Sequence, residues 1–89
     1  MYYTYALYSL KSNRIYIGHT EDLRQRLTEH NGGIGGKYSS KNKPFKLIFY
    51  EAFLAKNDAI LQEKFYKTGY GREVMKSKLK YTLEQCRVV

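Results

Sequence analysis

The sequence is poor in several residue types, and each scarcity excludes a class of protein. Among 89 residues there is one cysteine, one proline and no tryptophan. A lone cysteine cannot form an intrachain disulfide, and with only two histidines it cannot complete a four-ligand zinc site. No apolar run approaches the roughly 18 residues that span a bilayer, and the first residues lack a signal-peptide pattern. We therefore expect a cytoplasmic protein without a membrane segment.

Acidic residues are also scarce. Lysine and arginine total 16 against 8 aspartates and glutamates, which gives a net charge of +8. The excess is spread evenly, with 7 basic residues against 3 acidic ones in residues 1–45 and 9 against 5 in residues 46–89. A basic fold of this kind attracts polyanions, and nucleic acid is the foremost candidate. A basic surface that serves only solubility is the plainer alternative.

The first third of the chain predicts a β-hairpin followed by a helix. Residues 2–10 are rich in tyrosine and other strand formers, and residues 14–18 return antiparallel after a short turn in which Asn13 suits a left-handed backbone. A helix is expected over residues 20–29, with Thr20 as its N-cap.

The remaining elements predict a small α+β domain. A glycine- and lysine-rich loop covers residues 31–44, and residues 45–53 form the clearest strand, expected to be central or best buried. A second helix should begin near Asn57 or Asp58 and end at Gly69, and a third should run from Arg72 into the low eighties. The predicted fold is a single domain over residues 1–89. It contains a three-stranded antiparallel sheet flanked by about three helices, in the order β-β-α-β-α-α.

Strand alternation separates the residues of the hairpin between two faces. Side chains of successive strand residues point to opposite sides, so Tyr5 and Leu7 share one face of the first strand. On the second strand Tyr16 takes one face, while Ile15 and Ile17 take the other. For any single tyrosine, packing in the core remains the more common role.

The predicted helix after the hairpin brings an arginine and a histidine to one edge of the core. Leu23 and Leu27 form its buried stripe, and Arg26 and His30 lie one turn apart on a row beside that stripe. With Tyr16 at the end of the preceding strand, this arrangement suits the binding of a phosphate better than simple packing.

Glu63 is the acidic residue with the most unusual predicted setting. Helical geometry places it beside Ile60 and Tyr66, at the margin of the packed surface. Hydrolysis of a phosphodiester needs a base for water, a cation for the developing charge and a metal for the leaving oxygen. One carboxylate is too few for a two-metal site, which favours a single Mg²⁺ or Mn²⁺ held mainly through water. An ion pair with Lys67 at i+4 is the alternative.

Two lysine clusters are candidates for contact with the nucleic-acid backbone. They are expected to bind phosphates without reading bases. The loop cluster contains Lys37, Lys41 and Lys43, and the cluster on the last helix contains Lys76, Lys78 and Lys80.

In series, these motifs resemble the GIY-YIG nuclease superfamily, in particular its small stand-alone bacterial members. The second signature is intact as Tyr16-Ile17-Gly18, and the first is reduced to Tyr3-Thr4-Tyr5. Arg26, His30 and the helix carrying Glu63 follow in register, so that the resemblance covers nearly all of residues 2–80.

The resemblance implies a metal-dependent DNA endonuclease of structure-selective or nonspecific action, with DNA repair as one setting. It implies that Glu63 binds the metal and Arg26 stabilises the phosphate. Tyr5 or Tyr16 would act in proton transfer, together with His30. Several members use an asparagine beyond the metal glutamate, and this chain has none after Asn57.

Two rival functions remain open at this point. A non-catalytic nucleic-acid-binding module would keep the fold and the basic surface, but it would not require Glu63. A protein-interaction domain explains the charge poorly. The expected partner is DNA, with no membrane contact, and the expected state is a monomer or a weak dimer.

Overall fold

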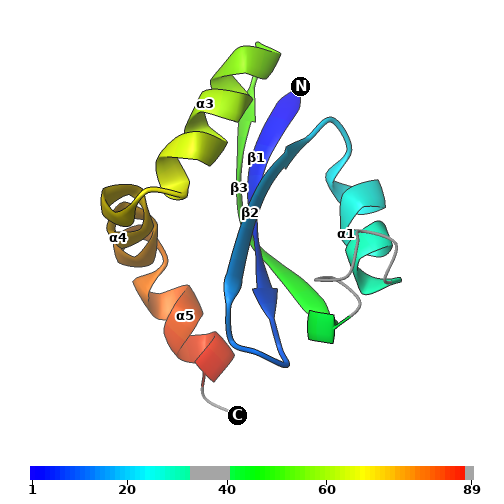
Figure 1. Ribbon diagram of the computed structural model, residues 1–89, viewed down its shortest axis with the longest axis vertical. Coiled ribbons are helices and arrows are strands. Elements are labelled where there is room, and N and C mark those ends of the chain that lie inside the picture. The colour runs from blue at the N-terminus through cyan, green and yellow to red at the C-terminus, as the bar shows by residue number, and fades with distance from the viewer. Residues whose placement is uncertain (33–40, 88–89) are drawn as a thin grey trace.

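The computed structural model shows an α+β fold in three layers, with the sheet in the middle (Figure 1). It describes residues 1–32 and 41–87. The element order over these residues is β-β-α-β-α-α-α, which confirms the predicted class and adds one helix. The strands are β1 (Tyr2–Ser9), β2 (Ile15–Thr20) and β3 (Phe45–Phe53), and the helices are α1 (Leu23–Asn31), α3 (Lys56–Tyr66), α4 (Gly69–Lys78) and α5 (Lys80–Arg87).

The sheet is antiparallel, and β1 is its central strand. The strand order is β2-β1-β3, so the prediction that residues 45–53 would be central was wrong. Six of the eight residues of β1 are buried, whereas β3 alternates between buried or half-buried and exposed positions along much of its length. Because β1 pairs with a strand on each side, its backbone hydrogen bonds are made within the sheet. β2 lies at one edge of the sheet.

Helices cover both faces of the sheet, as Figure 1 shows: α1 lies against one face, and α3, α4 and α5 lie against the other. The strand alternation predicted from the sequence is confirmed, because each face has its own hydrophobic cluster. The cluster under α1 contains Tyr5, Leu7 and Phe45, with Tyr16, Leu23, Leu27 and Leu47 packed against it. The cluster on the opposite face is built on Ala6, Tyr8, Tyr66, Met75, Leu79, Leu83 and Cys86, with Ile15 and Ile17 among its partners.

Helix α1 begins later than predicted. Thr20 was expected to be the N-cap, but it is the last residue of β2. Asp22 caps the helix, and its Oδ1 accepts the backbone N–H of Gln25 at 3.0 Å. Helix α3 also differs at its start, since Ala55 is the N-cap and makes no side-chain capping bond.

The segment after α3 contains two helices where one was predicted. Gly69 starts α4 and does not end α3, because the Thr68 hydroxyl caps α4 by accepting the N–H of Gly71 at 2.9 Å. A side chain at Gly71 would collide with the backbone of Phe65, so the close packing of α3 and α4 requires glycine there. The helix breaks again at Leu79, whose φ of −110° and ψ of 23° are not helical. Over the described residues, no helix has the length and apolar character to cross a membrane.

Candidate active site

Tyr5 and Gly18 bring the two signature segments into direct contact. They are cross-strand partners in the β1–β2 ladder, and the Tyr5 ring is only 4% exposed. A Cβ at position 18 would lie 2.6 Å from Cζ of Tyr5 and closer still to its hydroxyl oxygen. Gly18 therefore leaves the space into which the Tyr5 hydroxyl fits, and the Tyr16-Ile17-Gly18 motif has a packing reason for its last residue.

Arg26 and His30 meet the same hydroxyl from α1. Arg26 Nε donates to the Tyr5 hydroxyl at 3.3 Å, and His30 Nε2 lies 3.5 Å from that oxygen. The Arg26 side chain is 37% exposed, and its Nη1 lies 3.7 Å from a carboxylate oxygen of Glu29. Leu23 and Leu27 hold α1 against the sheet, as the sequence predicted. Arg26 and His30, which lie on the adjacent row of the helix, are therefore held beside the core.

The surroundings shift the pKa values of both basic groups in this cluster. The hydrogen bond to Tyr5 raises the pKa of the Arg26 guanidinium, so this group stays charged. Burial lowers the pKa of His30, and the nearby charge of Arg26 lowers it further. The lowered pKa favours the neutral imidazole, and in that form one of its ring nitrogens can accept a proton.

Tyr16 lies on the same face of the sheet as Tyr5 but belongs to a different part of the site. It pairs across the strands with Leu7, and its ring packs edge-on against Phe45 with centroids 5.3 Å apart. It also lines a groove along the outer side of β2. The structure therefore places the two tyrosines of the predicted site in distinct surroundings.

Glu63 approaches β2 from α3, on the opposite face of the sheet. Its Oε1 accepts a hydrogen bond from Nδ1 of His19 at 2.5 Å, and its Oε2 pairs with Nζ of Lys67 at 2.6 Å. The Glu63 side chain is 17% exposed, against 37% for His19 and 52% for Lys67. Burial alone would raise the pKa of Glu63, but the hydrogen bonds from Lys67 and His19 outweigh it and lower that pKa. Glu63 is thus a charged carboxylate at neutral pH.

His19 is the site residue that sequence reasoning missed. It follows Gly18 directly and bonds to Glu63, and it lines the same hollow of about 340 Å³ as Arg26. His19 therefore contacts the carboxylate on the α3 side and lines the hollow that Arg26 lines from the α1 side. Its place after Gly18 was the only signal in the sequence, since its partner is 44 residues away.

The described lysines of the two predicted clusters have different surroundings. Lys41 and Lys43 are exposed, and Lys37 lies outside the described residues. Lys76 lines the groove beside β2 and approaches Glu73 at 3.7 Å, while Lys80 lies over the ring of Tyr81 at 5.8 Å.

Lys78 has partners within the fold. Its Nζ donates to the Tyr66 hydroxyl at 3.1 Å, and that hydroxyl donates to Glu51 at 2.6 Å. The same ammonium lies 5.9 Å from the ring centroid of Phe49 and 5.6 Å from that of Tyr66. These contacts stabilise the packing of α4 on the sheet, so Lys78 is less available to a nucleic acid than Lys76.

The side chains that could ligate a metal here suit only a weakly bound cation. Among the described residues no group of three or more His, Cys, Asp or Glu side chains could hold a metal together. Glu63 supplies a single carboxylate, and the half-exposed Lys67 that now pairs with it is long and flexible enough to move aside. Mg²⁺ accepts such a site because it keeps several of its waters.

The fold is an α+β domain, and the comparisons identify its family as a nuclease-type one. The profile of the GIY-YIG catalytic domain matches residues 1–78, and the chain belongs to this family. A UPF0213 protein encoded in the ldhD 5' region of Pediococcus acidilactici is 38% identical over 82 residues, covering 90% of this chain and 79% of that protein. A UPF0213 protein of Bacillus pumilus is 39% identical, covering 75% and 67%. The solution NMR structure of UPF0213 protein BH0048 from Bacillus halodurans matches with a TM-score of 0.52 and 32% identity, covering 86% of this chain and 84% of that one.

Proposed function

We propose that this chain is an endonuclease that hydrolyses phosphodiester bonds in DNA with the help of one divalent cation, Mg²⁺ or Mn²⁺. The observation that carries the proposal is the cluster at Gly18, where the Tyr5 hydroxyl fits and Arg26 Nε reaches it at 3.3 Å. The carboxylate of Glu63 is hydrogen-bonded to His19, the residue that follows Gly18. Membership of a nuclease-type family supports the same reaction.

In this proposal Arg26 stabilises the phosphate. Its Nε donates to the Tyr5 hydroxyl, and this bond helps to orient the guanidinium. Among the described residues the ion-pair contact of Nη1 is with Glu29 at 3.7 Å, which is too long for a good hydrogen bond. A phosphate that gains negative charge in the transition state offers this group a stronger partner.

Glu63 would hold the cation, with water as the remaining ligands. When bound, such a cation neutralises charge on the phosphate and lowers the pKa of a water it coordinates. His19 donates to one Glu63 oxygen and fixes the carboxylate, and the second oxygen becomes available when Lys67 moves aside. His19 is thus a positioning residue for Glu63.

Proton transfer is assigned to one of two tyrosines. A free tyrosine has a pKa near 10, so it needs a nearby positive charge to act as a base. Tyr5 has Arg26 at its hydroxyl and the ring of His30 3.5 Å away, and Tyr16 lines the open groove. Replacing the tyrosine that acts should lower the rate by about 10² to 10⁴, the range for losing a general base. Tyr5→Phe and Tyr16→Phe, assayed side by side, therefore identify it.

A non-catalytic DNA-binding module is the second candidate, favoured by the pairing of Glu63 with Lys67 at 2.6 Å. The test is a nicking assay on supercoiled plasmid, blunt duplex, flap and forked DNA, with Mg²⁺, with Mn²⁺ and with EDTA. The nuclease proposal expects cleavage in the presence of either cation and none in EDTA. Binding to these DNAs without cleavage under any of the conditions would contradict the nuclease and favour the module.

A further inference from the structure

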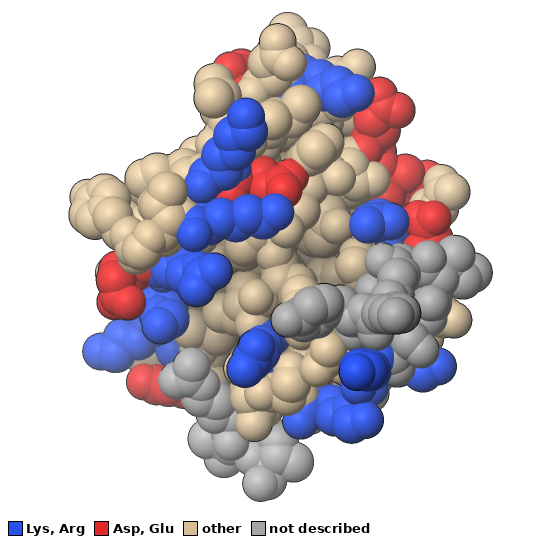
Figure 2. All heavy atoms as spheres, viewed as in Figure 1, with Lys and Arg blue, Asp and Glu red and all other residues tan. Residues whose placement is uncertain are grey.

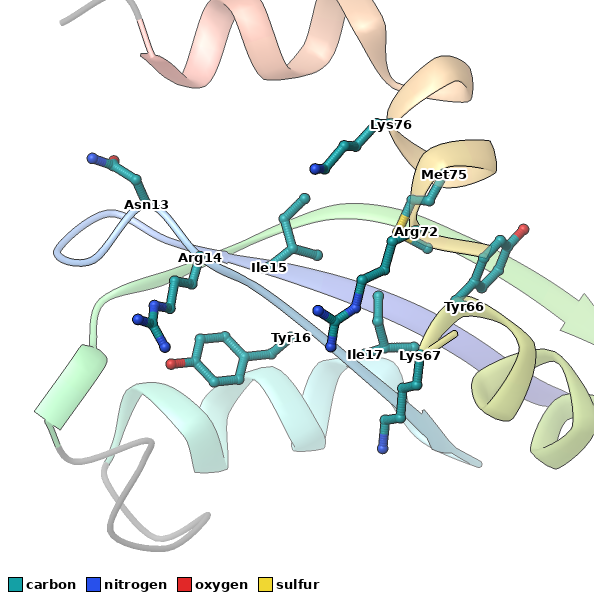
Figure 3. Close-up of a pocket in the computed structure, with 10 residues that line it drawn as sticks. All are labelled: Asn13, Arg14, Ile15, Tyr16, Ile17, Tyr66, Lys67, Arg72, Met75 and Lys76. Carbon is teal, nitrogen blue, oxygen red and sulfur yellow. The ribbon is translucent and has the colours of Figure 1, made fainter. Parts of the chain in front are cut away.

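A groove runs along the open edge of β2, beside the proposed catalytic centre. It has a volume of about 790 Å³ and is lined by residues of β2 and its preceding turn together with residues at the end of α3 and on α4. Figure 3 shows Arg72 and Lys76 reaching from α4 toward β2, with Arg14 and Tyr16 projecting from the β2 side. Within the described chain, no further strand pairs with this side of β2, so the groove is open to a ligand.

The groove is strongly cationic. Four of its ten lining residues are positively charged, and none is acidic. Figure 2 shows the same side of the molecule, with Lys and Arg side chains gathered around a tan hollow in front of the sheet. The smaller hollow beside Arg26 contrasts with it, because Glu21, Asp22 and Glu29 line that one. A polyanion is therefore attracted more strongly to the groove along β2 than to the hollow at the start of α1.

Two guanidiniums in the groove are available to a ligand. Lys67 and Lys76 each have a carboxylate partner, but Arg14 and Arg72 have no ion pair within residues 1–32 and 41–87. Both arginine residues are exposed. A guanidinium binds a phosphate through two parallel hydrogen bonds and is less strongly hydrated than an ammonium. Arg14 and Arg72 thus present two phosphate-binding groups on opposite sides of the groove.

The floor of the groove is apolar. Ile15, Ile17 and Met75 form it, and Tyr16 adds an aromatic ring at one side. Blunt duplex DNA hides the faces of its bases, so an apolar floor offers it little. A single strand exposes both base faces and phosphates, and it binds best where aromatic or apolar surface lies between cations. The combination favours a single strand.

We propose that this groove holds one single-stranded segment of DNA, with phosphates on Arg14 and Arg72 and bases against Tyr16 and the isoleucines. The segment would lead away from the proposed scission point, because Lys67 lies at the groove and pairs with Glu63. This inference rests on the proposed function and adds the substrate class: DNA in which single-stranded nucleotides adjoin the cleaved bond, such as a flap or a fork.

The test is fluorescence anisotropy with labelled dT₁₂ and a blunt 12-base-pair duplex, in EDTA so that no cleavage occurs. The variant is Arg14→Gln/Arg72→Gln. The control is Arg24→Gln/Lys46→Gln, which also removes two exposed positive charges, from residues that do not line the groove. Each lost phosphate contact should lower the salt slope for single strands by ~0.7, so the variant should lose about 1.4 in slope and about 25-fold in affinity for dT₁₂ at 0.1 M salt.

The control should bind dT₁₂ within about threefold of the parent protein, since its charges act only at long range. Equal losses in the variant and the control would overturn the groove assignment. A blunt duplex bound as tightly as dT₁₂, with the same loss in the variant, would overturn the single-strand assignment. Amide NMR shifts of Ile15, Ile17 and Arg72 on addition of dT₁₂ must also appear in the parent protein, and their absence would contradict the proposal.

The outcome is independent of turnover. A protein that binds dT₁₂ in the groove but never cleaves DNA would contradict the proposed nuclease and leave the groove assignment standing. A protein that cleaves DNA while the Arg14→Gln/Arg72→Gln variant binds dT₁₂ normally would support the nuclease and contradict the groove assignment. Melting temperatures of all variants, measured in parallel, show that binding losses do not arise from unfolding.

Discussion

Gly18→Ala tests the packing at the centre of the site. The new Cβ would lie 2.6 Å from Cζ and 3.0 Å from Cε2 of Tyr5. The ring is 4% exposed and belongs to the cluster that contains Leu7 and Phe45, so it cannot simply swing into solvent. Overpacking of this kind costs about 1–3 kcal/mol, and the reduced entropy of the unfolded chain returns about 0.4–1 kcal/mol. The middles of these two ranges leave a net loss of about 1.3 kcal/mol, and their extremes leave about 0–2.6 kcal/mol.

This loss should lower the melting temperature by roughly 4–8 °C per kcal/mol for a domain of this size. Cleavage should fall as well, because displacing the ring moves the Tyr5 hydroxyl away from Arg26 Nε. Gly69→Ala is the matched control, since a Cβ there meets nothing within 4 Å. It should be neutral or slightly stabilising in the first turn of α4. If Gly18→Ala melts and cleaves like Gly69→Ala, the packing argument is wrong.

Three further predictions concern single side chains. Arg26→Ala should lower the cleavage rate on the order of a hundredfold or more. The control Arg24→Ala, on the exposed side of α1, should leave the rate within about twofold of the parent. An Arg26→Ala protein that loses stability but keeps its cleavage rate would contradict the assignment of Arg26 to the phosphate. The pKa of His30 is lower in the folded state than its ordinary value of 6.5, so below about pH 7 the unfolded chain binds more protons than the folded protein does. The stability of the folded protein should therefore fall as the pH is lowered from 7.5 to 5.5. Melting temperatures should show a shallower fall for His30→Gln, and an unchanged pH dependence would count against this. Tyr66→Phe removes the hydroxyl that donates to Glu51 at 2.6 Å and should cost about 1–3 kcal/mol in urea unfolding.

Local patterns in the sequence predicted the α1 side of the site well. Alternation along a strand is set by the backbone, so Tyr5 and Tyr16 could be placed on one face and Ile17 on the other. The four-residue spacing of Arg26 and His30 likewise places both on one helical row, and both reach the Tyr5 hydroxyl. These relations depend on residues near one another in the chain or on fixed periods.

The features that were missed depend on contacts distant in sequence. The position of β1 in the centre of the sheet follows from its pairing with both neighbours, which hydrophobicity does not reveal. His19 meets Glu63 only because α3 packs beside β2. Lys78 sits on the same helix face that suggested a phosphate contact, but Glu51 of β3 and Tyr66 of α3 engage it. No pattern within one element predicts such neighbours.

The central claim is that Glu63 holds a catalytic cation, and Glu63→Gln tests it most directly. The amide keeps the shape and removes the charge that binds a hard cation. The surface pair with Lys67 contributes only about 0.3–0.5 kcal/mol, and the amide oxygen of glutamine can still accept the hydrogen bond from His19, so the fold should survive. Glu84→Gln, an exposed glutamate on α5, is the control. The measurement is Mg²⁺-dependent cleavage of forked DNA by the three proteins. We predict that Glu63→Gln loses cleavage while it binds DNA as tightly as the parent or slightly more tightly, and that Glu84→Gln cleaves normally. Cleavage by Glu63→Gln at the parent rate would contradict the account.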